Sequence, residues 1–358
     1  MACRVSVIIP TFNEAKSIYS IVPLVAEVFT KHKIDGEMIV VDDDSPDKTW
    51  KVAQELGARF PVKSVRRQGE RGLSSAVIKG FGYAKGEIIG VMDADFSHSP
   101  EYIAKLVEAI EVGGADIALG SRYMEAGRIK EWPWYRRLAS WTATFLASPF
   151  TRVKDPMSGF IFFRRQVIEG VRLNPIGFKI ALEIIAKGHY KQLKEIPIVF
   201  QNRLYGESKL TRGVVFEYLK QIWQLFWEVE TPIGQFIKFC LVGSAGLLVN
   251  LAVFSALIYV KHLHHLIAAV VSFFVAFTCN FCFNRFWTFK VCGGNSQTAA
   301  HRQYGRFLTV CLLGLGVNLV VLHFLLSVLG WHELLAQLTA ILVATSLNFF
   351  GSKKWAFK

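Results

Sequence analysis

The chain has 358 residues, of which 52% are apolar and 19% charged, and its formal net charge is +13. This apolar content excludes a disordered or fibrous protein. A mean hydropathy of +0.33 also argues against a single soluble domain, because polar surface is scarce in part of the chain.

Charge and hydropathy divide the chain near residue 232. Residues 233–358 hold nine Lys or Arg and a single acid, Glu333, whereas residues 1–232 hold the other 32 bases and 27 acids. The first part has the composition of a soluble α/β domain, and the second has that of a membrane domain. The positive charge is therefore not in itself the footprint of a nucleic acid, and we expect no nucleic-acid partner.

The N-terminal part alternates short apolar strands with helical patterns. The predicted strands are Val5–Ile9, Met38–Val41, Val62–Val65, Ile88–Met92, Ile117–Leu119 and Ile196–Phe200, with helices at Ser17–Phe29 and Trp50–Leu56. This order predicts a mostly parallel sheet with right-handed crossovers, whose ligands bind beyond the carboxyl ends of the strands. Because the N-terminus runs straight into a strand, we expect no cleavable signal peptide.

Two acidic clusters follow predicted strands at that edge. Asp42, Asp43 and Asp44 follow the second strand, and Asp93 and Asp95 follow the fourth. No Gly-rich dinucleotide or P-loop motif is present. Two carboxylates spaced as Asp-x-Asp suit Mg²⁺ or Mn²⁺, which bridges a diphosphate. A solvated turn is the alternative interpretation, and the bases that follow in the chain weaken it.

Basic residues recur downstream of these acids. They are Arg122, Arg136, Arg137, Lys179, Arg203 and Lys209. Each one alone is compatible with an ordinary surface charge. An acidic metal pocket that faces several bases, however, is what two phosphorylated substrates require.

Four long apolar stretches follow Pro232. They cover roughly 236–260, 266–289, 306–329 and 334–351, and each approaches or reaches the ~20 residues that cross a bilayer. A buried soluble bundle is the alternative, and four such stretches in succession disfavour it.

The membrane part repeats itself at an offset of 68 residues. Val249-Asn250-Leu251 matches Val317-Asn318-Leu319, Asn280-Phe281 matches Asn348-Phe349, and Gly246 matches Gly314. Each unit is one helical hairpin, so the two units are parallel repeats. We expect the four asparagines to hydrogen-bond between helices, and a substrate path is the alternative.

Bases mark one side of this membrane part. The side that carries the N-terminal domain also carries Arg285, Lys290, Arg302, Arg306, Lys353, Lys354 and Lys358, whereas Lys261 is the one base in the turns on the other side. The positive-inside rule predicts an integral membrane protein with its N-terminal domain in the cytoplasm.

Two segments of the N-terminal part are predicted to lie on the bilayer surface as amphipathic helices. One, near 134–148, repeats Trp134, Leu138, Trp141 and Phe145; the other, near 214–228, repeats Val215, Tyr218, Leu219, Ile222, Trp223 and Phe226. Helices that face the protein core are the alternative. Clustered Trp and neighbouring bases favour the bilayer surface.

An ordered series of motifs relates residues 1–230 to a known family. The motifs are Ile9-Pro-Thr-Phe-Asn-Glu14, Val41-Asp-Asp-Asp-Ser-Pro-Asp47, Gly72-Leu-Ser-Ser-Ala76, Asp93-Ala-Asp95, Gly120-Ser-Arg-Tyr123, Asp155-Pro-Met-Ser-Gly159, Asn174-Pro-Ile-Gly-Phe-Lys179 and Gly206-Glu-Ser-Lys-Leu210. With them, residues 1–230 resemble the family 2 inverting glycosyltransferases of the A-type fold, and within these the dolichol-phosphate mannose synthases. The remainder resembles the GtrA-like four-helix domain that is fused to some archaeal and bacterial members. The resemblance implies a Rossmann-like α/β domain over 1–230, followed by an all-α transmembrane domain of four helices over 231–358.

The resemblance also implies roles for the matching residues. Pro10, Phe12, Glu14, Val41 and Asp43 would hold the nucleoside; Asp93, Ala94 and Asp95 would hold the metal and the diphosphate; Lys179, Arg203 and Lys209 would neutralise the donor phosphates; Arg122, Arg136 and Ser140 would hold the acceptor phosphate. Asp95, Arg122, Arg136 and Ser140 form the implied catalytic set, and Arg122 is expected to contact the donor as well. Where the family often has a Gln as a further metal ligand, this chain has Ser97, followed by His98, so Ser97 joins Asp93 and Asp95 as the implied metal site. Because Ser is shorter than Gln, a water can intervene there, or the preferred metal can differ.

The implied reaction is the inverting, metal-dependent transfer of mannose from GDP-mannose to dolichyl (polyprenyl) phosphate. The chain has no Gln-x-x-Arg-Trp, the motif that follows the acidic catalytic base in processive synthases of this fold. A lipid phosphate acceptor explains this, because it is already anionic near pH 7 and needs no base. Two alternatives stay open: a UDP-glucose:polyprenyl-phosphate glucosyltransferase, and a lipid-linked sugar transporter whose soluble domain only senses nucleotide.

Overall fold

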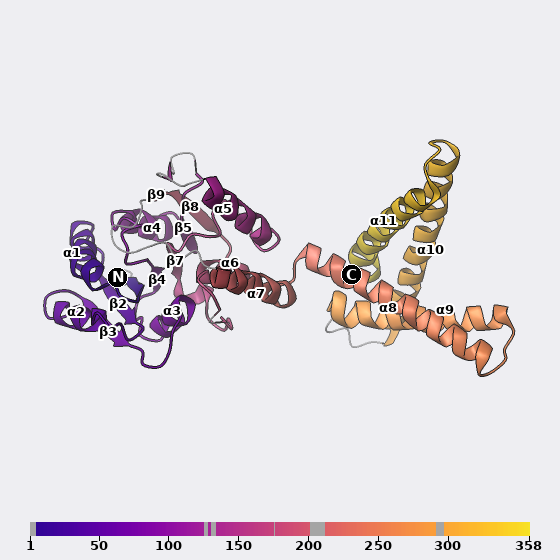
Figure 1. The fold of residues 1–358 in the computed structure, drawn as a ribbon, viewed down its shortest axis with the longest axis horizontal. Helices are drawn as coiled ribbons and strands as arrows, with labels where there is room; N and C mark the ends of the chain where they lie inside the picture. The colour runs from indigo at the N-terminus through magenta and orange to yellow at the C-terminus, as the bar shows by residue number, and fades with distance from the viewer. Residues whose placement is uncertain (1–4, 125–127, 130–133, 175, 201–211, 291–296) are drawn as a thin grey trace. The chain divides into compact units, whose positions relative to one another are not determined.

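Two compact units make up the chain. The computed structural model describes residues 5–124, 128–129, 134–174, 176–200, 212–290 and 297–358. The units are Met1–Val229 and Glu230–Lys358. Each has a hydrophobic core of its own, and Figure 1 shows the sheet in one and long helices in the other.

The described part of the first unit contains a seven-stranded sheet covered by helices. Its strands are β1 (Val5–Thr11), β2 (Gly36–Asp42), β3 (Val62–Arg66), β4 (Ile88–Val91), β5 (Ile117–Ser121), β7 (Ile161–Arg164) and β8 (Leu193–Pro197), and a separate pair joins β6 (Arg128–Ile129) to β9 (Val199–Phe200). The helices are α1 (Ala15–Lys31), α2 (Thr49–Leu56), α3 (Leu73–Phe81), α4 (Tyr102–Glu111), α5 (Trp134–Ala147), the short η1 (Arg165–Val167), α6 (Ile180–Lys187) and α7 (Arg212–Glu228).

The sheet order is β3-β2-β1-β4-β7-β5-β8. Among these described strands β7 alone runs antiparallel to its neighbours. The prediction of a mostly parallel α/β sheet is therefore confirmed.

Two details of the predicted strands are wrong. β7 is absent from the prediction, because a short apolar run of Phe and Ile does not by its periodicity distinguish a strand from a buried helix. The predicted strand Ile196–Phe200 covers the end of β8 and all of β9, which belong to different sheets. Between them Ile198 still donates its N–H to Ser121 O at 3.0 Å, so the apolar pattern continues across the change of sheet.

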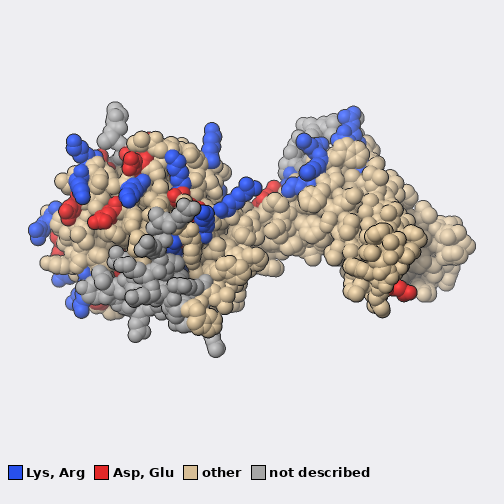
Figure 2. Space-filling view, turned by 90° about the horizontal axis from the view of Figure 1, so that it is seen from above, with Lys and Arg blue, Asp and Glu red and all other residues tan. Residues whose placement is uncertain are grey.

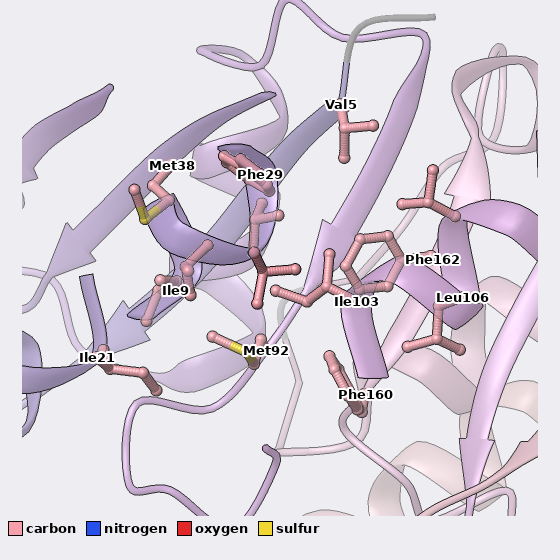
Figure 3. Packing of buried hydrophobic residues seen from close by; sticks show 14 of the residues in the cluster. Val5, Ile9, Ile21, Phe29, Met38, Met92, Ile103, Leu106, Phe160 and Phe162 are labelled. Atoms are coloured by element: carbon pink, nitrogen blue, oxygen red, sulfur yellow. The ribbon is translucent and has the colours of Figure 1, made fainter. Parts of the chain in front are cut away.

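Alternate residues of the central strands enter two cores, one on each face of the sheet. On one face Ile9, Met38 and Phe162 pack with residues of α1 and α4 (Figure 3). On the other face Ile8 and Phe163 pack with residues of α3 and α6. Since both faces are covered, the strands are continuous apolar runs. Each such fully buried side chain stabilises the unit by about 1.5–3 kcal/mol.

The second unit consists of two helical hairpins. Its elements are α8 (Pro232–Tyr259), α9 (His265–Phe283) with the π-helical turn η2 (Asn284–Thr288), α10 (Gln297–Ser327), and α11 (Glu333–Gly351) with the π-helical turn η3 (Ser352–Ala356). The described residues contain four helices that are long and apolar enough to cross a membrane, with mean hydropathies of 1.6 to 2.2. The prediction of four membrane helices is confirmed.

The two hairpins use the same internal contact. An added Cβ at Gly246 would overlap the Asn280 side chain, and one at Gly314 would overlap the Asn348 side chain. Buried small residues also recur at intervals of four in both hairpins, as Ala268, Ser272 and Ala276 in α9 and as Ala336, Ala340 and Ala344 in α11. Small residues let helix backbones approach closely, so the sequence repeat is also a packing repeat.

One asparagine contradicts the prediction of hydrogen bonds between helices. Asn348 Oδ1 is buried and has no hydrogen-bond partner among the residues that the structure describes. Instead the side chain fills the space beside Gly314. The glycine provides room for the amide but offers it no side-chain partner, so close packing decided this contact.

An aromatic cluster joins the two hairpins at one end. The rings of Phe239 and Phe349 lie 5.7 Å apart, as do those of Phe281 and Phe357, and both pairs connect one hairpin to the other. Figure 1 shows the hairpins diverging from this end. Figure 2 shows most of this unit's visible surface without charge and its Lys and Arg gathered together. A surface of this kind suits contact with hydrocarbon, with the bases at one boundary.

Candidate active site

The predicted site residues meet at one edge of the sheet. β1, β2, β4 and β5 end there, and β7 begins there because it runs in the opposite direction. The segments at this edge are Phe12–Glu14, Asp43–Asp44, Asp93–His98, Arg122–Tyr123 and Asp155–Gly159. Three non-glycine residues in them, Asn13, Asp44 and Phe96, have positive φ angles of 60°, 54° and 63°. Such strained backbone is typical of functional sites.

Asp43 is held by Arg67 and by the loop after β3. The Arg67 side chain is 1% exposed. Its Nε donates to Asp43 Oδ1 at 2.7 Å, and its Nη2 donates to the same oxygen and to Gly72 O. Gly72 N–H donates to Asp43 Oδ2 at 2.8 Å, so both carboxylate oxygens are oriented. Arg67 is absent from the predicted site; its place just after β3, the neighbour of β2, is the signal that could have indicated it.

The other residues predicted to hold the nucleoside lie on β1 and β2 and in the turn after β1. Phe12 is half-buried, and the guanidinium of Arg71 lies 4.7 Å from its ring centroid. Glu14 is also half-buried and directly precedes α1. Pro10 and Val41 are paired in the β1–β2 register, and their side chains are buried in the sheet. The structure thus brings these residues onto two adjacent strand ends.

Asp93 and Asp95 lie directly after β4. The Asp93 side chain is 31% exposed, whereas Asp95 is 5% exposed. Ser97 is buried and donates its backbone N–H to Asp95 Oδ1 at 3.0 Å, which orients that carboxylate. Two carboxylates at this spacing, one partly open to solvent, fit a hard cation such as Mg²⁺ or Mn²⁺. Ligation by the Ser97 hydroxyl stays a prediction.

His98 is buried next to Asp93, with its Nδ1 3.7 Å from Asp93 Oδ2. It is 2% exposed and stacks on Phe160, with ring centroids 4.8 Å apart. Its Nδ1 accepts the Asp93 N–H at 3.4 Å. Burial lowers the pKa of His98, Asp93 and Asp95 oppose that shift, and the cations Arg122 and Lys179 add to it. Burial therefore favours the neutral form of the ring.

Arg122 forms a bidentate pair with Asp155, a residue absent from the predicted site. Arg122 Nε donates to Asp155 Oδ2 and Nη2 donates to Oδ1, both at 2.7 Å, and the Arg122 backbone N–H donates to Oδ2 at 2.9 Å. Asp155 is 0% exposed and Arg122 is 8% exposed. A buried fork of this kind fixes the plane of the guanidinium. The membership of Asp155 in a family motif is the signal that could have indicated it.

Helix α5 is connected to the same segment. Ser140 Oγ and Tyr123 Oη are hydrogen-bonded at 2.8 Å, which brings Ser140 next to the residue that follows Arg122. Arg136 lies on α5 one turn before Ser140, and its side chain is outside the described part. Arg203 and Lys209 also lie outside the described residues.

The segment Asp155–Gly159 contacts several of the predicted site residues. Lys179, at the start of α6, donates from Nζ to Met157 O at 2.9 Å. A Cβ added at Gly159 would lie 3.2 Å from Asp93 Oδ2. Together with the Arg122–Asp155 pair, these contacts place Asp93, Arg122 and Lys179 around one short segment. The structure therefore brings together the acids and two of the predicted bases.

Helices α5 and α7 expose apolar side chains. On α5, Trp134, Leu138, Trp141 and Phe145 are between 53% and 75% exposed, so the alternative that this face packs on the core is wrong. On α7, the exposed residues are Val215, Phe216, Leu219 and Trp223, whereas Tyr218, Ile222 and Leu225 belong to a cluster with Met157. The predicted face of α7 is thus partly wrong, because Tyr218 and Ile222 attach the helix to the core.

Comparison with known proteins covers both units. The model of glycosyl transferase family 2 matches residues 6–172, and that of the GtrA/DPMS transmembrane domain matches residues 238–357. The chain is 43% identical to a dolichol-phosphate mannosyltransferase of Pyrococcus furiosus over 354 residues, which is 97% of each chain. It is 38% identical to a dolichol-phosphate mannosyltransferase of Saccharomyces cerevisiae over 240 residues, 63% of this chain and 88% of the relative.

A solved structure is also similar to the chain. It is the glucosyl-3-phosphoglycerate synthase of Mycobacterium tuberculosis, at a TM-score of 0.47 and 18% identity, covering 62% of this chain and 80% of that one. The Pyrococcus furiosus relative matches both units of this chain together, and the match makes the N-terminal unit a glycosyltransferase rather than only a nucleotide sensor. The chain is a membrane-embedded glycosyltransferase that belongs to the dolichol-phosphate mannosyltransferase family, a branch of the family 2 glycosyltransferases.

Proposed function

We propose that this enzyme transfers mannose from GDP-mannose to dolichyl phosphate, with inversion at the sugar and with Mg²⁺ or Mn²⁺ as cofactor. The observation that carries the proposal is the convergence of Asp93, Asp95, Arg122 and Lys179 at one sheet edge, where the segment Asp155–Gly159 contacts three of them. Both substrates carry phosphate, and this edge offers acids for a cation and cations for phosphate oxygens. The names of the relatives support mannose and dolichol phosphate as sugar and acceptor.

The donor side is assigned to the ends of β1, β2 and β4. Phe12 and the Arg67-oriented Asp43 would contact the nucleoside, with Pro10, Glu14 and Val41 shaping the same region. Asp93 and Asp95, with the backbone of Ala94 between them, would hold the divalent cation. That cation supplies neutralisation of the diphosphate when it is bound. Lys179 would add a positive charge on the departing phosphates, and Arg203 and Lys209 are proposed for the same role.

The acceptor side is assigned to Arg122, Arg136 and Ser140. These residues would position the lipid phosphate in line with the bond that breaks. A phosphate oxygen of the acceptor then forms a bond to the anomeric carbon, and the bond from that carbon to the β-phosphate oxygen breaks. GDP leaves with the electron pair, and the α-linked donor yields a β-linked product. The attacking oxygen is already anionic, so no protein base is required.

The lipid acceptor requires the catalytic domain, proposed as residues 1–230, to lie against a bilayer. The exposed Trp and Phe of α5 and α7 support such contact, because amphipathic aromatic faces enter the membrane–water interface. The bases at one end of the membrane domain, residues 231–358, support a location of the catalytic domain on the cytoplasmic side of the membrane.

The test offers the purified enzyme GDP-mannose, UDP-glucose and UDP-GlcNAc side by side, with dolichyl phosphate and Mg²⁺ or Mn²⁺. We expect transfer from GDP-mannose; equal or greater transfer from UDP-glucose would favour the glucosyltransferase alternative. Asp95→Ala should abolish transfer. Asp35→Ala is the matched control, because Asp35 is exposed and precedes β2 at the opposite edge of the sheet.

A further inference from the structure

Helix α7 contacts the backbone of Lys179, a proposed donor-site residue, through Gln221. Most of the outward face of α7 is exposed, but Gln221 is only 3% exposed. Its Nε2 donates to the backbone oxygen of Lys179 at 3.0 Å. This bond restrains the backbone at the start of α6, because it adds a buried side-chain donor to the carbonyl of the residue that precedes the helix.

The loop before Lys179 packs closely against α7 at Gly177. Gly177 has a φ of +66°, and a Cβ there would lie 3.7 Å from Glu217 Cβ and 3.9 Å from Gln221 Oε1, both on α7. On its other side, Gly177 O accepts the Ser74 hydroxyl at 2.7 Å. The backbone that leads to Lys179 is thus fixed between α3 and α7.

The Lys179 ammonium is also connected to α7, by a second route. Nζ donates to Met157 O, and the Met157 side chain packs in one cluster with Leu225 and Tyr218 of α7. Tyr218 in turn donates its hydroxyl to Ala143 O of α5 at 2.6 Å. Both the backbone and the charged end of Lys179 therefore depend on the placement of α7.

The C-terminal end of α7 is anchored independently. Lys187 Nζ lies 2.5 Å from Glu228 Oε2 and 2.5 Å from Glu183 Oε1, which links α7 to α6. Gln224 Nε2 donates to Glu228 Oε1 at 2.7 Å. Loss of the Gln221 bond alone would therefore leave α7 attached, so its effect is expected at Lys179 and not in the fold.

We propose that Gln221 is a positioning residue that sets Lys179 for the donor phosphates, so that the helix with the exposed aromatic face determines the geometry of the donor site. The inference rests on the proposed function, which gives Lys179 its role at the donor. It predicts that Gln221 acts through Lys179 and has no separate effect on the acceptor.

The experiment uses the full chain in phosphatidylcholine vesicles with GDP-mannose and dolichyl phosphate. We expect Gln221→Leu to lower kcat/KM for GDP-mannose about tenfold, the factor that one buried hydrogen bond of typical strength represents. KM for dolichyl phosphate should stay within about twofold of wild type. Gln221→Glu keeps the size and polarity but turns a second oxygen toward Lys179 O, so it should show the same loss. Gln224→Leu, the same change one turn away, should leave both constants unchanged.

A double-mutant cycle with Lys179→Ala separates positioning from general damage. If Gln221 acts through Lys179, then Gln221→Leu should change activity less than about twofold when Lys179 is already Ala. A full additional tenfold loss in that background would overturn the positioning role, and so would a loss confined to KM for dolichyl phosphate. If Lys179→Ala itself leaves the GDP-mannose kinetics unchanged, the donor role of Lys179 in the proposed function fails instead.

Discussion

The catalytic and membrane units differ in how they use buried polar side chains. In the catalytic unit, buried charges form oriented pairs, Asp43 with Arg67 and Asp155 with Arg122. In the membrane unit, small residues recur through the helix contacts, and several buried polar atoms have no partner within the described part: Asn284 Oδ1, Thr288 Oγ1, Asn348 Oδ1 and Ser352 Oγ. The catalytic unit also contains such atoms, among them Ser121 Oγ and Gln221 Oε1, so the difference lies in the pairing of its buried charges. Directional pairing orients groups toward a charged substrate, whereas close helix packing depends on volume.

The largest expected effect comes from removing the partner of a buried charge. Asp155→Ala leaves the Arg122 guanidinium buried without its carboxylate, which should lower the free energy of unfolding by about 3–5 kcal/mol. Transfer to dolichyl phosphate should fall by more than about 100-fold, the size of a lost electrostatic contact in a transition state. Chemical unfolding and a transfer assay measure the two effects.

The control is an exposed ion pair in the same unit. Arg66 and Asp44 lie 2.5 Å apart with side chains 39% and 40% exposed. Asp44→Asn should cost less than about 1 kcal/mol, because solvent screens such a pair and Asn, like Asp, tolerates the positive φ at this position. Equal losses from the two substitutions would mean that burial does not distinguish the catalytic pairs.

A smaller effect is expected when a substitution at Arg67 keeps the positive charge but loses the planar guanidinium that binds Asp43. Arg67→Lys retains a cation beside Asp43 but cannot reproduce the guanidinium fork, so we expect a loss of about 2 kcal/mol in stability. KM for GDP-mannose should rise more than KM for dolichyl phosphate, because Asp43 is proposed to contact the nucleoside. Steady-state kinetics with each substrate varied in turn would show this; an equal rise in both constants would contradict it.

The stability of the membrane unit should depend on the side-chain volume at the glycines of its helix contacts. Gly246→Ala adds a Cβ that overlaps Asn280, whereas a Cβ at Gly243, on the same helix, meets nothing within 4 Å. We expect Gly246→Ala to destabilise the first hairpin by about 1–2 kcal/mol, whereas Gly243→Ala should be neutral or slightly stabilising, because Ala favours a helix more than Gly does. Thermal unfolding in detergent, followed by Trp fluorescence, compares them. The same result is expected for Gly314→Ala against Gly316→Ala, since an added Cβ at Gly316 also meets nothing.

The smallest effect concerns a polar group near the surface of the catalytic unit. Hydrogen bonds from the backbone N–H groups of Lys191 and Gln192 lower the pKa of Asp116. Its stabilisation is therefore complete above its ordinary pKa, near 4, and is lost as pH falls through the lowered value. Asp116→Asn should flatten the decline of the unfolding midpoint between about pH 5 and pH 3. An unchanged slope would mean that these bonds do not favour the ionised form.

Much of the site could be predicted because its residues lie at strand ends. Asp93 and Asp95 follow an apolar run, and the parallel order of the strands brings their carboxylates to the same edge as Asp43. The partners of the buried charges were beyond prediction. Arg67 lies 24 residues from Asp43, and Asp155 lies 33 residues from Arg122, and no periodicity relates residues so far apart.

In the membrane unit, too, some features could be predicted from the sequence and others could not. Helix number and repeat follow from hydropathy and from the 68-residue offset. The contact of Asn348 with Gly314 does not, and the expected hydrogen bond of the asparagine is wrong because close packing, not amide pairing, decided it.

The sequence by itself determined the two-part architecture, the location of the acids and the membrane helices, because hydropathy and strand order act locally along the chain. Only the tertiary structure decided which charges pair, that β7 enters the sheet antiparallel, and that Gln221 of α7 binds the backbone of Lys179. The physical reason is that burial, which makes these contacts strong, exists only after distant segments have packed together.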